Sequence, residues 1–364
     1  MKFVILFSII AALSCSQQQS PVDQKLDQVF DSVFKANEPG GAVLIAKEGK
    51  IIYQKGFGLA DIVTKKAIDA TTLFNVGSIS KTFVAFGILQ LAKENKLSLD
   101  DNIYKYFPDF KDSLIAKRIK IHHLLTHSSG LPDIRKVSED SVFYLTAKDE
   151  ENWAPIKQTD HLEFEPGERY NYSNPAFNGL ALIIEKVSGM KWQDYIKKNI
   201  MAPAGMITST ITDGSYPETG VSHGYLFDGN PPAGRAGKYF EKDYGEEPTF
   251  AASGNGGVWS SVEELWKYEQ AIQQHIFLDS SWVNKSRTVF PFQNWKDSLP
   301  SFIGLCWFIT ESGNQKTIGH TGSQGGFRAD YVWLPEKNIF YVILCNTPRP
   351  LSQIRKSVFE ILLN

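Results

Sequence analysis

A serine followed three residues later by a lysine occurs three times in this chain, and the copy at Ser78 and Lys81 has the most suggestive surroundings. A serine hydroxyl is a weak nucleophile unless a base lies within hydrogen-bond reach. Residues three apart on a helix share a face, so Lys81 can hold its amine near the Ser78 hydroxyl. The start of a helix also offers unpaired backbone N–H groups that suit a developing oxyanion. The pair therefore indicates nucleophilic catalysis.

The other two copies lie in less suitable contexts. Ser32 and Lys35 fall inside an amphipathic helical pattern, and residues 188–191 span a glycine at a predicted helix end. Only the middle copy follows an extended apolar run and precedes a long apolar helix, with Gly77 just before the serine. The alternative for that copy is structural, with Ser80 as a helix N-cap and Lys81 as a surface lysine.

Hydrophobic periodicity predicts the elements that must position the pair. Strand patterns occur near both ends of the chain, at residues 42–47, 51–56, 302–310, 316–320, 328–334 and 339–345. Helical patterns occupy residues 21–37, 80–95, 176–188, 261–274 and 351–362. Residues 213–257 are rich in Gly, Pro and Tyr and indicate long loops over a cleft.

These patterns predict an α+β fold. An antiparallel sheet is built from both chain termini and flanked by helices, with a mainly helical lobe inserted between residues 100 and 300. The helix at 80–95 is apolar nearly all round, which is typical of a helix buried inside a protein. The nucleophile candidate is thus expected at the junction between sheet and lobe.

The N-terminus differs from the rest of the 364 residues. Residues 1–15 have one lysine, an eleven-residue apolar run and then Ser14 and Cys15, which predicts a signal peptide of lipoprotein type with Cys15 as the lipidated residue. Plain secretion is the alternative. Residues 16–21 are a polar linker, and residues 22–364 form the folded domain. A net charge of −2 gives no basic field for nucleic acid.

A turn-rich loop at residues 167–174 completes a set of four motifs in a fixed order. With it, the chain resembles the serine β-lactamase and penicillin-binding-protein superfamily, in its class C-like branch of DD-peptidases and esterases. The resemblance runs over nearly all of residues 22–364. It is carried by residues 74–81, by residues 121–131, by Tyr172-Ser173-Asn174, and by Gly319-His320-Thr321-Gly322.

The resemblance implies a role for each matching residue. Ser78 would be acylated, with Lys81 as its neighbouring amine. Tyr172 would be the general base for acylation and for the deacylating water. Asn174 would hydrogen-bond Lys81 and the amide of the substrate. The backbone N–H groups of Ser78 and Ser323 would form the oxyanion hole.

Free lysine and tyrosine both titrate near pH 10, so neither is a base at neutral pH without a shifted pKa. Burial lowers the pKa of a lysine, while a nearby ammonium lowers that of a tyrosine. Two such groups can share one proton and titrate together.

The substrate-binding strand would contain His320, Thr321 and Gly322, and His320 departs from the lysine of the K-T-G form of this motif. A histidine is mostly neutral near pH 7, so the fixed cation of the lysine is lost. This departure argues against strong β-lactam hydrolysis and favours esters or peptides. Arg328 is a candidate for restoring a carboxylate contact, with a surface salt bridge as the alternative.

Other residues invite competing readings. His123 and His127 are one helical turn apart, but a zinc motif with His122 is absent and helix-end packing is favoured. Glu165 and Glu168 are expected to be solvated, and Tyr170 to pack within its loop. The remaining expectations are that Cys306 and Cys345 are buried free thiols, and that four aromatic side chains line the cleft or anchor loops, namely Tyr225, Phe227, Tyr239 and Tyr244.

Together these observations predict an exported serine hydrolase without cofactor or metal. It would act through an acyl-enzyme on D-amino-acid peptides, esters or, weakly, β-lactams, in the periplasm or at the cell surface. Its partners would be small-molecule or peptide substrates, with membrane contact only through the lipid anchor. The alternative is a non-catalytic envelope protein that binds peptidoglycan or a partner in the same cleft.

Overall fold

The computed structural model describes residues 20–135, 146–212, 216–217, 219–226, 253–312 and 315–363. The predicted signal segment with Cys15, and the loop aromatics Phe227, Tyr239 and Tyr244, lie outside these residues. Among the described helices, none is both long and apolar enough to cross a bilayer.

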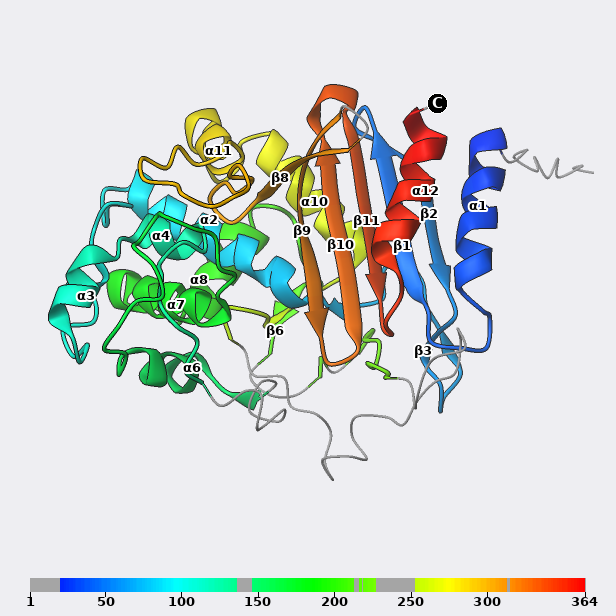
Figure 1. Cartoon of the computed structure of the whole chain (residues 1–364). Helices are drawn as coiled ribbons and strands as arrows, with labels where there is room; N and C mark the ends of the chain where they lie inside the picture. The colour runs from blue at the N-terminus through cyan, green and yellow to red at the C-terminus, as the bar shows by residue number, and fades with distance from the viewer. Residues whose placement is uncertain are drawn as a thin grey trace, which may run out of the picture.

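A six-stranded antiparallel sheet is the centre of the fold, and it is assembled from both ends of the chain as predicted (Figure 1). The strand order is β2-β1-β11-β10-β9-β8. The two N-terminal strands are thus continuous with the C-terminal ones, because β1 pairs with β11. The strand bounds are β1 Gly41–Lys47, β2 Lys50–Phe57, β8 Phe308–Ser312, β9 Gln315–Gln324, β10 Phe327–Leu334 and β11 Ile339–Cys345.

The C-terminal strands differ from their predicted bounds in two places. Residues 302–307 do not form a strand, and β8 begins only at Phe308. Within that segment Cys306 has a φ of 78°, a left-handed conformation that no strand residue adopts. By contrast, β9 continues past His320 to Gln324, so the motif at 319–322 lies inside a strand. Cys306 and Cys345 are buried and free, as expected.

Helices cover both faces of the sheet, because each face carries apolar side chains. On one face α1 (Pro21–Val33) and α12 (Leu351–Leu363) pack side by side and against the strands (Figure 1). On the other face lie α2 (Ser80–Lys93) and α10 (Val262–Gln273), whose N-cap Ser261 accepts a hydrogen bond from the N–H of Glu264.

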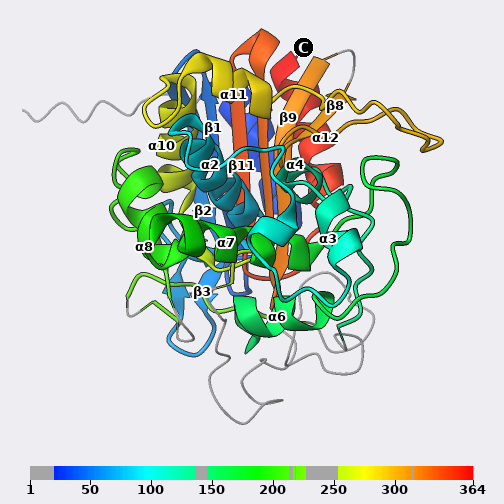
Figure 2. The same ribbon diagram turned by 90° about the vertical axis from the view of Figure 1, so that its left-hand side faces the viewer.

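The helical lobe lies beside the sheet in Figure 1, on the side of α2, and in front of the sheet in Figure 2. Its elements are η2 (Ile103–Lys105), α3 (Ser113–Arg118), α4 (Ile121–Leu125), α6 (Asp149–Ile156), α7 (Asn174–Ser188), α8 (Trp192–Ile196), the π-helical turn η3 (Lys197–Met201) and α11 (Ser280–Ser286). Short strands form two smaller sheets. One has the order β5-β7-β6, from Phe74–Asn75, Val258–Ser260 and Thr210–Ile211, and the other pairs β3 (Leu59–Asp61) with β4 (Lys66–Ala67).

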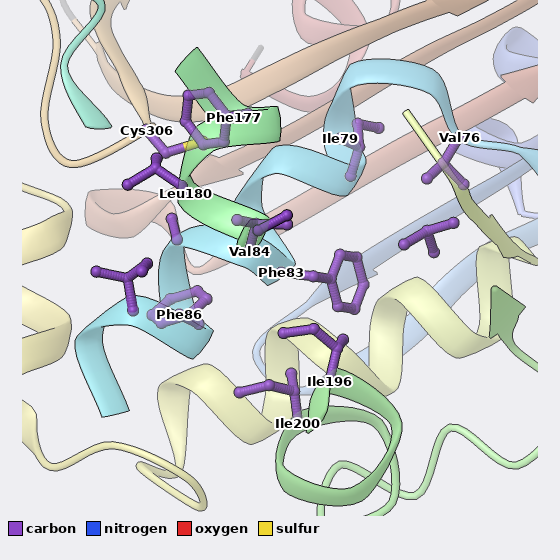
Figure 3. Packing of buried hydrophobic residues seen from close by; sticks show 14 of the residues in the cluster. Val76, Ile79, Phe83, Val84, Phe86, Phe177, Leu180, Ile196, Ile200 and Cys306 are labelled. Carbon is purple, nitrogen blue, oxygen red and sulfur yellow. The ribbon is translucent and has the colours of Figure 1, made fainter. Parts of the chain in front are cut away.

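Helix α2 is buried around almost its whole circumference, as its sequence predicts. Phe83 stacks on Tyr268 of α10 with ring centroids 4.1 Å apart. Apolar side chains of α7 and η3 close in from other sides, with Phe177 and Ile200 among them (Figure 3). Each fully buried large side chain contributes about 1.5–3 kcal/mol of transfer free energy. Packing of this density fixes the first turn of α2, where the candidate nucleophile lies.

Candidate active site

Ser78 and Lys81 are in direct contact. Ser78 lies in the 3-10 turn η1 (Gly77–Ile79), and Lys81 lies in the first turn of α2. The Lys81 Nζ is 2.9 Å from the Ser78 Oγ. Ser80 is not the N-cap of α2, which is Ile79; the Ser80 hydroxyl accepts a hydrogen bond from the N–H of Val258. The middle copy of the motif therefore brings its two side chains together.

The copy at Ser32 does not. There the hydroxyl donates to the Val29 carbonyl oxygen, while the amine of Lys35 donates to the Asp31 carbonyl oxygen at the protein surface.

The Lys81 amine is buried and has no solvent exposure. Burial is the largest influence on it and lowers its pKa from 10.5 to about 7; the nearby Cys306 opposes this shift and Arg135 adds to it. A desolvated ammonium loses hydration that a neutral amine does not need, which is why the pKa falls. Near neutral pH a large share of the Lys81 amine is thus unprotonated and able to accept the Ser78 proton.

The turn that holds Ser78 lies directly against strand β9. Gly77 has a φ of 53°, and a side-chain carbon at this position would be 2.6 Å from the backbone nitrogen of Ser323. Only glycine tolerates both the left-handed backbone and this close approach. The contact brings the backbone of Ser78 beside that of Ser323, the pair expected to form an oxyanion hole.

Substitution Gly77→Ala should lower the acylation rate by roughly 10²–10³-fold, the usual effect of losing one oxyanion-hole donor. The added carbon would push η1 away from β9 and misalign the two N–H groups. The measurement is the rate of covalent labelling by a fluorophosphonate probe, with circular dichroism as the control for folding. A folded Gly77→Ala variant that is labelled at the wild-type rate would contradict this role.

Tyr172 lies beside the amine. The Lys81 Nζ is 5.1 Å from the centroid of the Tyr172 ring, and this ring is partly exposed. The same ring stacks on the imidazole of His127, with centroids 4.3 Å apart. The N–H of Ser173 donates to the Nδ1 of His127 over 3.0 Å. His127 thus holds the Tyr172 loop by a ring contact and a hydrogen bond, which goes beyond the helix-end packing expected for it.

Asn174 begins helix α7 and lines one cavity together with Ser78 and Tyr172. In the described part of the chain its side chain makes no hydrogen bond to Lys81, unlike the arrangement implied by the family resemblance. The amine instead donates to the backbone carbonyl oxygen of Asn255 over 2.7 Å. Sequence patterns give no sign of Asn255, because its contribution comes from the backbone.

A cavity of about 350 Å³ opens above the serine. It is lined by Ser78, Tyr172, Asn174, Phe308, Thr321, Gly322 and Ser323. Along β9 the side chains alternate, so Thr321 and Ser323 are exposed while His320 and Gly322 are buried. The cavity thus brings six of the eight predicted catalytic and substrate-binding residues to one surface, with Lys81 beneath it.

His320 lies behind the cavity wall. Its side chain is 2% exposed, packs on Phe308 at 4.8 Å between ring centroids, and approaches Tyr172 at 6.4 Å. The Nδ1–H of the neutral ring donates to the Thr321 carbonyl oxygen over 2.7 Å. Burial, followed by the Lys81 charge, lowers the pKa of His320 to about 3. The ring is therefore uncharged at neutral pH and supplies no cation for a substrate.

Several neighbouring residues differ from expectation or decide between alternatives. Glu168 is buried, not solvated, because it accepts the N–H of Glu165 and pairs with Lys296 at 2.9 Å. The Arg328 guanidinium donates to the Phe327 carbonyl oxygen over 2.8 Å. Tyr225 anchors a loop, since its hydroxyl accepts the N–H of Ile62 and its ring is buried.

The histidines of α4 pack as expected. The His122 ring stacks on Phe290, and the His123 Nδ1 accepts the N–H of Lys120. Within the described residues, no group of three or more His, Cys, Asp or Glu side chains is arranged to hold a metal ion. Tyr170 packs on Phe302 with ring centroids 4.9 Å apart, which agrees with its predicted packing role.

Comparison with known proteins adds independent evidence. The family model described as Beta-lactamase matches residues 22–360. Penicillin-binding protein 4* of Bacillus subtilis (strain 168) is 28% identical over 323 residues, which cover 83% of this chain and 67% of that protein. Protein flp of Staphylococcus aureus (strain NCTC 8325 / PS 47) is 27% identical over 89% of this chain and 63% of its own length. The chain thus spans about two thirds of the length of these relatives.

Solved structures share the fold over almost the whole chain. The octameric penicillin-binding protein homologue from Pyrococcus abyssi aligns with a TM-score of 0.76 and 28% identity, over 94% of this chain and 76% of that one. The D-amino acid amidase from Ochrobactrum anthropi SV3, complexed with L-phenylalanine amide, aligns with a TM-score of 0.77 and 21% identity, over 95% and 99% of the two chains. The second likeness concerns the fold alone.

Proposed function

The chain belongs to the beta-lactamase family of serine hydrolases, and we propose that it hydrolyses amide or ester bonds through an acyl-enzyme on Ser78. The observation that carries this proposal is the buried Lys81 amine, with a pKa near 7 and its Nζ 2.9 Å from the Ser78 Oγ. No carboxylate of the described residues pairs with this amine, and a buried lysine without a paired anion is costly to maintain. Its position against a serine is what general-base activation of a nucleophile requires.

In the proposed reaction, the neutral Lys81 amine accepts the Ser78 proton as the oxygen attacks the substrate carbonyl. The backbone N–H groups of Ser78 and Ser323 stabilise the resulting oxyanion. The proton then passes to the leaving amine or alcohol, leaving the acyl group on Ser78. Tyr172, beside the amine and open to the cavity, activates the water that releases the acid.

The cavity favours substrates without a free carboxylate next to the scissile bond. Among its described lining residues none carries a positive charge, and His320 is neutral and buried. A carboxylate in such a site loses hydration without gaining an ion pair. Amides and esters of amino acids avoid this penalty.

A substrate panel with an active-site label tests this function. We expect p-nitrophenyl esters and D-amino acid amides to be turned over faster than D-alanyl dipeptides or a chromogenic cephalosporin, both of which carry a carboxylate. Peptide mapping after fluorophosphonate treatment should find the adduct on Ser78. An adduct on another residue would reject Ser78 as the nucleophile, whereas no adduct together with tight peptidoglycan binding would favour the binding-protein alternative.

We also propose that the enzyme is exported, on the evidence of residues 1–15. Attachment through Cys15 would hold it at the cell envelope, where D-amino acid derivatives occur. Metabolic labelling with a palmitate analogue tests the attachment, because Cys15→Ser should remove the label. Retention of the label in Cys15→Ser would overturn the lipid-anchor part of the proposal.

A further inference from the structure

The Lys81 amine has a second hydrogen-bond partner besides Ser78, in the loop that contains Asn255. Lysine has four rotatable side-chain bonds, so one contact to Ser78 does not fix the amine. The second contact is the Asn255 carbonyl oxygen, 2.7 Å from the Lys81 Nζ. When the amine is neutral, one N–H is engaged there and the lone pair remains for the Ser78 proton. The position of Asn255 therefore helps set the geometry of proton transfer.

Two hydrogen bonds fix the loop around Asn255 to the helical lobe. The N–H of Gly254 donates to the Asp149 Oδ1 over 2.8 Å, and the Asn255 side-chain amide donates to the Asn178 Oδ1 over 3.2 Å. Asn178 in turn donates to the Asp149 Oδ1 over 2.7 Å. Gly254 is pressed onto α7, where an added side-chain carbon would be 2.7 Å from the Phe177 carbonyl oxygen. The loop thus has little room to shift.

Asp149 is the point where these bonds converge. It begins α6, is 6% exposed, and receives a third hydrogen bond at Oδ2 from the Trp192 Nε1–H over 2.7 Å. Within the described residues no cation pairs with this carboxylate. Burial raises its pKa to about 7, and the three hydrogen bonds oppose that rise. The negative charge of Glu185 also raises this pKa. Lys148 and Lys191 line the surface pocket that Asp149 borders.

We propose that Asp149 is a positioning residue for the catalytic centre: through Gly254 and Asn178 it fixes the Asn255 carbonyl oxygen that holds the Lys81 amine against Ser78. The inference rests on the proposed function, because it concerns how the proposed base, Lys81, is held in place. Asp149 does not line the cavity above Ser78 and does not contact the serine. Its contribution should therefore appear in the rate of the chemical step and not in binding.

The test measures how fast Ser78 is labelled by a fluorophosphonate probe at increasing probe concentrations. This gives a maximal labelling rate and the concentration for half that rate. In Asp149→Ala the maximal rate should fall by about 10²-fold, the size expected when a catalytic group is displaced by about 1 Å. The half-saturating concentration should stay within about twofold, because the cavity is unchanged. Asn178→Ala should show the same split with a smaller, roughly tenfold, loss.

A matched control separates positioning from stability. Asp330 is an equally buried carboxylate on β10 that pairs with Arg355 of α12 on the far face of the sheet. Asp330→Asn should lower the melting temperature but leave both labelling constants unchanged. A folded Asp149→Ala variant with the wild-type maximal rate, or with a loss only in half-saturation, would overturn the inference. If Asp149→Ala does not fold, Asn178→Ala decides by the same criteria.

The proposed function can fail separately. Absence of a Ser78 adduct in the wild-type protein would reject the acyl-enzyme itself, whatever the variants show. A normal wild-type adduct with unchanged Asp149→Ala and Asn178→Ala rates would reject only the positioning role.

Discussion

Replacing Ser78 with alanine should reduce ester and amide turnover by about 10⁶-fold, the loss seen when the nucleophile of a serine hydrolase is removed. The Ser78 Oγ is the atom that would form the covalent bond to the acyl group. Among the described residues, the amine that contacts this oxygen is that of Lys81. Any remaining rate would come from binding and oxyanion stabilisation alone. The measurement is steady-state turnover of the best panel substrate, with fluorophosphonate labelling beside it.

The alanine variant should fold normally. Ser78 is only half-buried, and removing its hydroxyl leaves the Lys81 amine with its bond to Asn255. Unchanged melting behaviour is therefore the control. A tenfold loss or less, with labelling still present, would mean that another residue is the nucleophile.

The sequence predicted those contacts of the site that form between residues close together in the chain. Ser78 and Lys81 are three residues apart, so helix geometry alone predicts their contact. Tyr172 and Asn174 entered through the resemblance to known motifs, and the structure brings both to the cavity. The resemblance also implied that Asn174 holds the Lys81 amine, whereas in the structure that amine donates to the carbonyl oxygen of Asn255.

Asn255 shows why the rest could not be predicted. Its carbonyl oxygen meets Lys81 across 174 positions of sequence, and a backbone carbonyl is present at every residue. Nothing in the type of residue 255 signals the contact. The role of His127 was missed for a related reason, because it depends on contacts with Tyr172 and Ser173, which lie in a different segment of the chain. Both contacts arise only when distant segments pack together.

For the fold, too, the sequence predicted some elements correctly and others wrongly. Alternation and turn residues predicted the strands at both termini, and the sheet that joins them is confirmed. The segment 302–307 was predicted wrongly as a strand because it is apolar, whereas its backbone turns at Cys306. Glu168 was expected in solvent because charged residues in turns usually are, but Lys296 and a backbone N–H compensate its burial.

Replacing Lys81 with methionine should lower acylation by about 10⁴-fold while the protein stays folded. Methionine fills a similar volume, and the buried amine it replaces is expensive to desolvate. The change leaves the Asn255 carbonyl oxygen unpaired, which costs about 1–3 kcal/mol. These effects oppose each other, so the free energy of unfolding in urea should change little. A folded variant with a tenth or more of the wild-type acylation rate would exclude Lys81 as the base.

The pH profile gives the same residue a signature of its own. The active form of Lys81 is the neutral amine, whose pKa is about 7. Below that pH the amine is protonated and cannot accept the Ser78 proton, so kcat/KM should fall about tenfold per pH unit on the acid side and level off above it. His320 cannot produce this limb, because burial lowers its pKa to about 3. In Lys81→Met the limb should disappear from the residual activity; a limb that persists near pH 7 would assign it to a different group, and Asp149, whose pKa is also about 7, would then be the next residue to substitute.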